Sequence, residues 1–297
     1  MSLPMSERTP PTHLYLNIRG LHLHVAFWPG DGDPLLLLHA TGFHARCWDE
    51  IVRRLPGRPV FAVDLPCHGG SDAVRPPPGW DETSEMITEV VRQLDLRNIT
   101  AAGHSFGGHI LVQTAARETA RFRSLLLLDP VIPPPEFLPL WQAAGSFEPV
   151  SRRRNAWASP EEMAEAFRTR IPYDTWDAAV LRDYCQYGLV KEEGAEHYRL
   201  ACPPDCEAAV YGNIGAQTVY ELLPRVTVPV RIIRARGRRP DDRLHDFRPS
   251  PTWAELASKL PQATDRQLPE QDHFFPMSDP GLVARELGEL LSLPLAP

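Results

Sequence analysis

A stretch of nine residues, T-A-A-G-H-S-F-G-G at positions 100–108, constrains the fold of this chain more than any other. It contains a G-x-S-x-G pattern centred on Ser105. An apolar run at 99–102 precedes the pattern, and a helix-like segment at 109–116 follows it. This order of a strand, a sharp turn and a helix exposes the serine on a strained turn. Glycines are needed there because a tight turn leaves little space for side chains and can require a positive φ. A plain helix-capping serine is the alternative. The rest of the chain favours the strained turn.

Length and charge exclude several classes of protein. The 297 residues suffice for one large core with an inserted subdomain. Hydrophobic residues make up 43% and charged residues 23%, as in an ordinary soluble globular protein. A net charge of −7 gives no basic surface for nucleic acid. Residues 1–11 lack a basic region followed by an apolar stretch, and no run has the length of a membrane span. We expect a cytoplasmic protein with no nucleic-acid or membrane partner.

Cysteines and histidines give no sign of a metal site. The chain has five dispersed cysteines, an odd number that predicts reduced thiols rather than a disulfide framework. Cys202 and Cys206 have no second pair nearby to complete a zinc site. His22 and His24 fall on one face of an expected strand, but no third ligand is evident. We therefore expect neither metal nor cofactor, and the oligomeric state stays open.

Strand and helix patterns alternate along most of the chain. Alternating residues at 14–20 and 21–28 predict an antiparallel hairpin. Continuous apolar runs are typical of strands buried on both faces, and they occur at 34–38, 99–102 and 124–128. Another buried strand is expected at 60–65, and a further strand at 228–235. Helical spacing follows at 48–55, 82–96, 109–116, 251–260 and 279–291, with a short strand at 266–268. This order predicts an α/β fold with a mostly parallel sheet and helices on both faces.

The alternation is interrupted between 131 and 223. A proline-rich exit at 131–135 is followed by short helical segments that carry several aromatic residues, and strand-like runs are missing. We predict an α-helical cap inserted at 131–223 into a core made of 13–130 and 224–297, after a flexible arm at 1–12.

Three motifs together resemble the α/β-hydrolase superfamily, in its form of serine hydrolases with a helical cap. They are the turn around Ser105, the strand exit L-H-A-T-G at 38–42, and Q-D-H-F-F-P at 271–276. The sequence D-L-P-C-H-G-G-S at 64–71 also resembles the family's loop after the next strand. The family usually has His-Gly at the strand exit, where this chain has Ala40 in place of the glycine. The resemblance covers the chain from about residue 14 and implies an eight-stranded sheet.

The resemblance implies that Ser105 is a nucleophile and His273 its base. A serine hydroxyl needs a base to take its proton during attack. Relatives that act by displacement at carbon have Asp at this position, so serine implies attack on a carbonyl. The family places its histidine last in sequence, and His273 lies just before the last helix. Three other histidines follow Ser105, but they fall on the next helix (His109), in the cap (His197) and in a charged loop (His245).

The acid that would orient His273 has more than one candidate. Asp129 ends the strand at 124–128, and some relatives carry the acid there. Asp241 or Asp242 follows the strand at 228–235, but their loop lacks the usual Gly-x-x-Asp pattern and its arginines could pair with them. Asp246 is a further alternative. We favour Asp129, whose role would be to hold the imidazole tautomer and stabilise the imidazolium.

The resemblance also implies an oxyanion hole formed by the main-chain N–H groups of Thr41 and Phe106. His39 is interpreted as a structural residue beneath this loop, and residues 152–154, three arginines, as a solvated run. Aromatic residues could line a substrate pocket. These are Phe43, Trp141, Trp157, Trp176 and Phe274.

These features predict a serine hydrolase of carboxylic esters or related acyl compounds, lactones included, acting on a small apolar acyl substrate through an acyl-enzyme on Ser105. Acyl transfer would use the same residues and is not separable. Hydrolysis of a carbon–carbon bond in β-diketone-like substrates is an alternative, although the His-Gly-Ser-Gly-Pro-Gly loop of such enzymes is absent. A non-catalytic ligand-binding module on the same fold is the other alternative.

Overall fold

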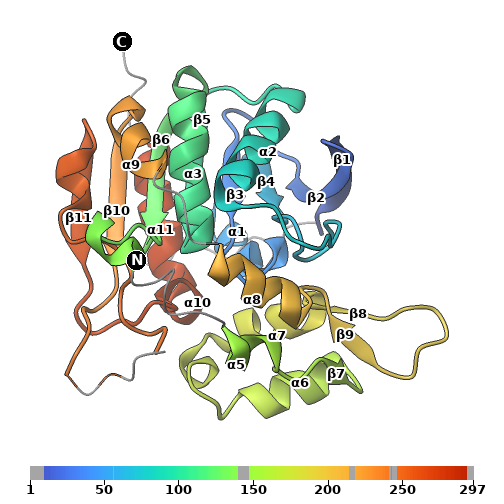
Figure 1. Cartoon of the computed structure of the whole chain (residues 1–297). Coiled ribbons are helices and arrows are strands. Elements are labelled where there is room, and N and C mark those ends of the chain that lie inside the picture. The colour runs from blue at the N-terminus through green and yellow to red at the C-terminus, as the bar shows by residue number, and fades with distance from the viewer. Residues whose placement is uncertain are drawn as a thin grey trace.

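A single large sheet forms the centre of the protein (Figure 1). The computed structural model describes residues 10–55, 57–139, 147–213, 218–240, 242 and 246–292. Within them, eight strands pair in the order β1-β2-β4-β3-β5-β6-β10-β11. Strand β2 is antiparallel to both β1 and β4, and the remaining pairs are parallel. The predicted eight-stranded, mostly parallel α/β sheet is confirmed.

The elements of this core lie close to the predicted ranges. The strands are β1 Thr12–Ile18, β2 Leu21–Trp28, β3 Leu35–Leu38, β4 Val60–Val63, β5 Ile99–His104, β6 Phe122–Leu128, β10 Val230–Arg234 and β11 Ala263–Gln267. The helices are α1 Asp49–Val52, α2 Trp80–Gln93, α3 Phe106–Arg117, α10 Phe275–Ser278 and α11 Pro280–Leu291.

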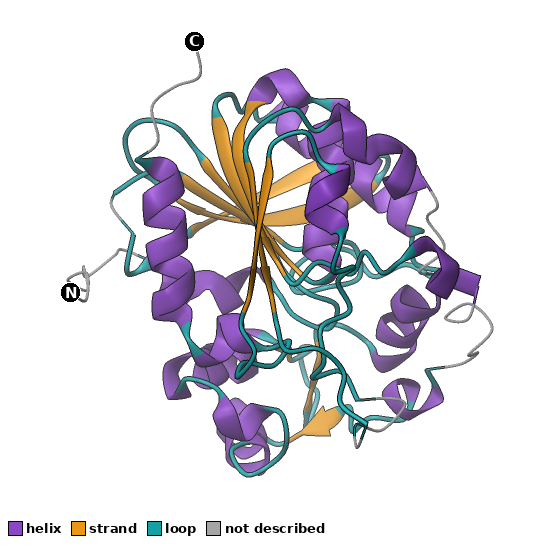
Figure 2. Cartoon of the chain, turned by 90° about the vertical axis from the view of Figure 1, so that its left-hand side faces the viewer, coloured by secondary structure: helices purple, strands orange, loops and turns teal. Residues whose placement is uncertain are grey.

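Helices cover both faces of the sheet, which explains why a central strand such as β3 is apolar throughout (Figure 2). All four leucines of β3 are fully buried. Because side chains alternate between the two faces of a strand, Leu36 and Leu38 join the cluster that contains α2 and α3. Leu35 and Leu37 join the cluster that contains α1 and α11. The continuous apolar runs in the sequence therefore mark strands with a core on each side.

Two predictions for the core need correction at their ends. Thr12, expected in a flexible arm, is the first residue of β1, and residues 1–9 lie outside the described residues. The helix expected at 251–260 is reduced to one 3₁₀ turn, Leu256–Lys259. The first residues of this segment are not helical, because the N–H of Trp253 donates to the carbonyl of Ile132, in another part of the chain, instead of to a carbonyl of its own segment.

The segment between β6 and β10 contains strands as well as helices. Its helices are α5 Glu148–Ser151, α6 Pro160–Phe167, α7 Ala178–Tyr187, α8 Pro204–Gly212 and α9 Thr218–Leu222. Three short strands, β7 Ala156–Trp157, β8 Leu189–Val190 and β9 Tyr198–Leu200, pair in a second, antiparallel sheet. The expectation that strands are missing here is therefore wrong. Strands of two or three residues are too short to produce a readable alternation.

The inserted segment packs on the loop that follows β3. One hydrophobic cluster joins Trp157, Phe167 and Tyr184 of the insertion to Phe43 of that loop and to Met277 of α10. In Figure 1 most of the insertion lies together below the sheet, where α5, α6, α7 and α8 gather. These helices thus lie near the turn after β3, at the carboxyl end of that strand.

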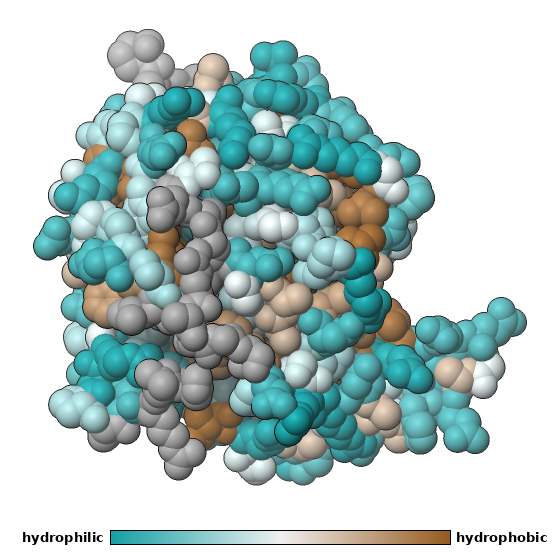
Figure 3. All heavy atoms as spheres, viewed as in Figure 1, coloured by the Kyte–Doolittle hydropathy of each residue, from teal (hydrophilic) through white to brown (hydrophobic). Residues whose placement is uncertain are grey.

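The surface is mostly polar on the face seen in Figure 3, with separate hydrophobic patches. The loop between β8 and β9 projects away from the body and is hydrophilic, in keeping with its sequence K-E-E-G-A-E-H at 191–197. Among the helices of the described residues, none is long and apolar enough to cross a membrane.

Candidate active site

Ser105 occupies a strained turn between β5 and α3. Its φ of 55° and ψ of −117° lie outside the ordinary regions for a residue with a side chain, a conformation that costs about 1–3 kcal/mol. The glycines on either side are required by space. A Cβ on Gly103 would lie 2.5 Å from the carbonyl oxygen of Gly107, and one on Gly107 would lie 2.3 Å from the carbonyl oxygen of Leu38. The G-x-S-x-G pattern therefore permits close packing of α3 on β5 and β3.

Ser105, His273 and Asp129 form one hydrogen-bonded chain. The Nε2 atom of His273 lies 2.9 Å from the Ser105 hydroxyl, and its Nδ1 atom lies 2.7 Å from Oδ2 of Asp129. The side chains are almost enclosed, with exposed fractions of 6% for Ser105, 6% for His273 and 0% for Asp129. A carboxylate can only accept, so Nδ1 carries the proton and Nε2 is free to accept from the serine.

Asp129 stands at the end of β6 and is held by donors from the neighbouring strand end. Its Oδ1 atom accepts the N–H of Ala235 at 3.1 Å and the hydroxyl of Thr252 at 3.1 Å, and it also accepts the hydroxyl of Ser250. These bonds satisfy a carboxylate that has no contact with water. The other oxygen, Oδ2, is thereby left for His273.

The alternative acids are placed differently. Asp242 forms a bidentate pair with Arg236 at 2.8 Å for each bond, and Arg236 holds the pKa of Asp242 below its ordinary value. Asp246 pairs with Arg248. Asp241 lies outside the described residues. Among the described candidates, the structure therefore brings Asp129 to His273 and gives Asp242 and Asp246 arginine partners.

His273 lies on the loop between β11 and α10 and is fixed through its main chain. Its N–H donates to the carbonyl of Arg248 at 2.7 Å, and its carbonyl accepts from Nε2 of His104 at 2.9 Å. Burial lowers the pKa of His104 well below its ordinary value, so this ring is neutral. Both main-chain polar groups of His273 are thus bonded, which holds its side chain in position beside Ser105.

The other histidines that follow Ser105 lie elsewhere. His109 points away from the serine, with Nδ1 donating to the carbonyl of Val131 at 2.9 Å and the ring against Trp80. His197 is exposed on the β8–β9 loop. His245 lies outside the described residues.

The two predicted oxyanion donors lie on chain segments that touch each other. Phe106 is the first residue of α3, and the N–H groups of a first helical turn have no acceptor within the helix. Thr41 is buried in the turn after β3, where the N–H of Phe43 donates to the carbonyl of Ala40 at 3.1 Å. Because Gly107 abuts the carbonyl of Leu38, the start of α3 is held against the end of β3.

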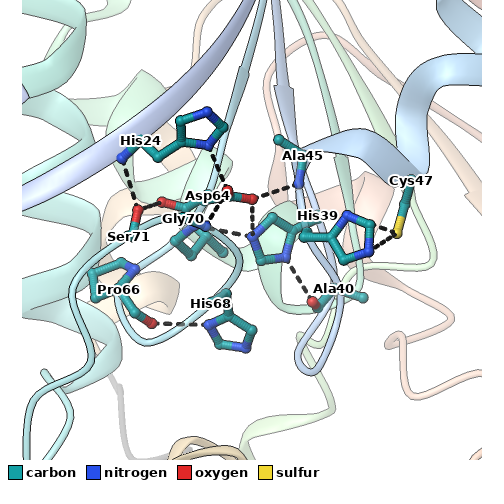
Figure 4. A network of polar contacts seen from close by, with 12 residues as sticks. His24, His39, Ala40, Ala45, Cys47, Asp64, Pro66, His68, Gly70 and Ser71 are labelled. Carbon is teal, nitrogen blue, oxygen red and sulfur yellow. Dashed lines mark hydrogen bonds and ion pairs between the residues drawn. The ribbon is translucent and has the colours of Figure 1, made fainter. Parts of the chain in front are cut away.

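A polar network lies beneath this turn, centred on Asp64 at the end of β4 (Figure 4). Its carboxylate accepts from Nδ1 of His24 at 2.6 Å and from the N–H groups of Ala45 at 2.6 Å and Gly70 at 2.8 Å. Burial opposes this charge, but the His24 hydrogen bond and nearby histidines bring the pKa of Asp64 to about 2. The loop after β4 is therefore wrapped around a buried carboxylate.

The predicted pocket residues are only partly brought together. Phe43 packs against Trp176, with ring centroids 5.5 Å apart, and against Phe274 at 6.3 Å. Phe274 also meets the His273 ring edge to face at 5.4 Å. Trp157 lies on the other side of the same cluster, against Phe167. Trp141 lies outside the described residues.

Arg153 is only 20% exposed and is paired, contrary to the expectation of a solvated arginine run. It donates to Oε2 of Glu207 on α8 at 2.6 Å and to the hydroxyl of Tyr184 on α7 at 3.3 Å. Burial raises the pKa of Glu207, although Arg153 acts in the opposite direction. A Cβ on Gly42 would lie 2.4 Å from Oε1 of Glu207, so this pair rests directly on the turn after β3.

A model of the Alpha/beta hydrolase family matches residues 35–286, most of the chain, and so includes the strand ends and loops that carry these side chains. The chain belongs to this family. Human monoglyceride lipase is 28% identical over 286 residues, which cover 88% of this chain and 84% of the lipase. The fold is similar to that of E-2-(acetamidomethylene)succinate hydrolase, with a TM-score of 0.75, 20% identity, and 95% of this chain and 100% of that chain covered.

The chain spans less than half the length of several other curated relatives that it matches. Lipase LipV of Mycobacterium tuberculosis is 30% identical over 115 residues, or 38% of this chain and 43% of the lipase. An esterase of the same organism is 34% identical over 110 residues, or 34% of each chain. These relatives support a hydrolase activity, and they do not define a substrate.

The sequence pattern does not identify several residues of this candidate site. His68, Tyr184, Arg153 and Glu207 all border the turn after β3, and none was singled out as part of the site. The histidine inside the loop at 64–71 was the one available signal, because that loop was already recognised. The others come from the insertion, whose fold the sequence pattern does not specify.

Proposed function

We propose that this protein is a serine hydrolase that cleaves carboxylic esters or related acyl compounds through an acyl-enzyme on Ser105. The observation that carries the proposal is the hydrogen-bonded chain Ser105–His273–Asp129, with the serine on a strained turn at a strand end. Such an arrangement supplies a nucleophile, a base within reach of its proton and a group that orients the base.

In the first half of the reaction, Oγ of Ser105 attacks the substrate carbonyl while its proton passes to Nε2 of His273. The carboxylate of Asp129 stabilises the imidazolium that forms. The N–H groups of Thr41 and Phe106 bind the oxyanion of the tetrahedral intermediate, each contributing about 3–4 kcal/mol. Collapse of the intermediate breaks the ester bond, and the leaving alkoxide takes the proton from His273. An acyl group then remains on Ser105.

In the second half, a water molecule repeats the attack. His273 takes a proton from the water as the water oxygen attacks the acyl carbonyl, and the same two N–H groups bind the oxyanion. Collapse breaks the bond between the acyl carbon and Oγ of Ser105, the imidazolium returns its proton to Oγ, and the carboxylic acid is released. These steps use side chains and main-chain groups of this chain, and the same residues would open a lactone.

The insertion at 131–223 acts as the cap of this site. Its Trp176 and Tyr184 pack on Phe43, which adjoins the proposed oxyanion donor Thr41. Together with Phe274 beside His273, these rings offer an apolar wall. The proposed substrate is therefore a small ester with an apolar acyl or alcohol group.

The proposal is tested with a fluorophosphonate probe and a panel of p-nitrophenyl esters. Wild-type protein is expected to be labelled and to turn over at least one short-chain ester, and Ser105→Ala is expected to lose both. Ser124→Ala is the matched control, because Ser124 is a buried serine on the adjacent strand β6. Absence of labelling and turnover in folded wild-type protein would reject the proposal and favour a non-catalytic binding module.

A further inference from the structure

Two buried histidines stand at the ends of neighbouring strands. His39 directly follows β3, and His68 lies in the loop after β4 (Figure 4). Their side chains are 1% and 0% exposed, and their ring centroids are 5.1 Å apart. Because β3 and β4 are parallel and adjacent, their carboxyl ends lie side by side. Each ring is therefore within reach of the other strand's loop.

The hydrogen bonds of His39 define its tautomer. The main-chain N–H of Leu65, just after β4, points at Nε2 of His39 with a distance of 3.0 Å. An amide N–H can only donate, so this Nε2 is an acceptor without a proton. The proton is therefore on Nδ1, which donates to the carbonyl of Ala40 at 2.8 Å.

His68 makes the mirror arrangement from the other loop. The N–H of Gly42, in the turn after β3, donates to Nε2 of His68 at 3.0 Å. Its Nδ1 donates to the carbonyl of Pro66 in its own loop at 2.9 Å, a contact drawn in Figure 4. Each histidine thus donates to its own loop and accepts a main-chain N–H from the other.

These bonds act on the two peptide groups that flank Thr41. A peptide group is planar, so the hydrogen bond of His39 to the carbonyl of Ala40 also fixes the direction of the Thr41 N–H. The bond of His68 to the N–H of Gly42 fixes the next peptide plane. Gly42 has a φ of +77°, in the left-handed region that glycine adopts without strain.

We propose that His39 and His68 form a reciprocal clamp that aims the Thr41 N–H at the substrate carbonyl, with His68 as a positioning residue of the oxyanion hole. This inference rests on the proposed function, because it assigns a task to a donor of that reaction. The clamp needs both rings neutral. Burial brings the pKa of His39 to about 3, with repulsion from His68 acting in the same direction, and burial brings that of His68 to about 4.

The test compares three variants with p-nitrophenyl acetate as the substrate. His68→Phe keeps an aromatic ring and removes the acceptor. His68→Gln keeps an acceptor oxygen near the position of Nε2. His109→Phe is the matched control, since His109 is also buried and donates through Nδ1 to the main-chain carbonyl of Val131, with Gln113 at its Nε2.

We expect His68→Phe to lower kcat by about 10–100-fold with KM within about threefold, because a misdirected donor loses part of the 10²–10³-fold effect of an oxyanion N–H. His68→Gln should recover most of the loss, and His109→Phe should keep wild-type kcat. Wild-type kcat in folded His68→Phe, or an equal loss in His109→Phe, would overturn the clamp.

A spectroscopic measurement tests the clamp independently of turnover. Long-range ¹H–¹⁵N correlation spectra of protein with ¹⁵N-labelled histidine should show both rings protonated at Nδ1 and bare at Nε2 near neutral pH, with His68 assigned by its absence in His68→Gln. A proton on Nε2 of His68 would refute the inference, even if His68→Phe does not fold. If wild-type protein neither reacts with fluorophosphonate nor turns over esters, the proposed function fails, and the spectra still decide the clamp.

Discussion

Replacement of Asp129 by asparagine should stop the reaction by reversing the tautomer of His273. Three donors, from Ala235, Ser250 and Thr252, point at Oδ1 of Asp129. In Asp129→Asn the amide oxygen will remain with these donors, because the alternative orientation places NH₂ against them. The amide NH₂ then faces Nδ1 of His273, which must accept, and its proton moves to Nε2.

A protonated Nε2 cannot take the proton of Ser105. The expected loss is about 10³–10⁴-fold in kcat, equivalent to about 4–5.5 kcal/mol of transition-state stabilisation. Because asparagine is nearly isosteric with aspartate, the fold should be retained, and a circular dichroism melt checks this.

The assay is ester turnover at saturating p-nitrophenyl substrate, normalised to the active-site concentration of each preparation. Asp242→Asn is the matched control, since it neutralises a carboxylate that the structure pairs with Arg236 rather than with His273. Its kcat should stay within about threefold of wild type, in line with the small effects of substitutions outside a reactive site. The reasoning is refuted if Asp129→Asn turns over at a similar rate to wild type, or if Asp242→Asn shows the larger loss.

Three further outcomes are expected. Gly42→Ala should lower the free energy of unfolding by about 1–3 kcal/mol in urea titrations, because a Cβ meets Glu207 and the φ is positive, whereas Gly212→Ala, which has open space, should not. Burial holds the pKa of three histidines at about 3 or 4, so the unfolded chain, with pKa values near 6.5, binds more protons between pH 6.5 and 4. As the pH is lowered from 6.5 to 4, the free energy of unfolding should therefore decrease by about 1.4 kcal/mol per pH unit for each histidine. His109→Phe should remove the contribution of one histidine to this slope. The histidines are His39, His68 and His109. All five cysteines are free and buried with raised pKa values, so Ellman's reagent should react quickly with five thiols in denaturant and with none in the native protein.

The sequence predicted those parts of the site that depend on short segments of chain. The turn around Ser105 is specified by two glycines within two residues of the serine. Gly103 packs against the main chain of Gly107, and Gly107 packs against that of Leu38, so neither position has space for a larger residue. The leucine run of β3 predicted a strand with a core on both sides for a similarly local reason. Such features depend only on the residues of one strand or one turn, so the sequence alone is enough to predict them.

The acid was ambiguous because it depends on contacts between distant segments. Asp129 and the loop of Asp242 follow strands that are neighbours in the sheet, so either could lie near His273. Arg236 pairs with Asp242, whereas the hydroxyls of residues 250 and 252 donate to Asp129. These pairings distinguish the two candidates, and the sequence alone does not show them.

The insertion was the least predictable part. Arg153 lies in a run of three arginines, and its neighbours Arg152 and Arg154 are substantially exposed. Its own side chain is only 20% exposed, because α7 and α8 bring Tyr184 and Glu207 to it from positions 31 and 54 residues away. A charge run alone predicts a solvated surface. The carboxylate of Glu207 offsets the desolvation penalty of the Arg153 guanidinium, and the sequence around Arg153 does not reveal this partner.

The strand order gives a physical reason for the division of roles around Ser105. Strand β5 carries the serine, and its two neighbours are β3, which leads to Thr41, and β6, which ends at Asp129. Adjacent strands are about 4.8 Å apart, so each neighbour delivers its group beside the serine with a short loop. An acid at the end of β10 would have to reach across β6. Here β10 instead leads to Ala235, whose N–H holds the carboxylate that β6 provides. In the proposed site, β10 therefore orients the carboxylate of Asp129, and the sequence after β10 needs no acid of its own, which agrees with the missing Gly-x-x-Asp pattern there.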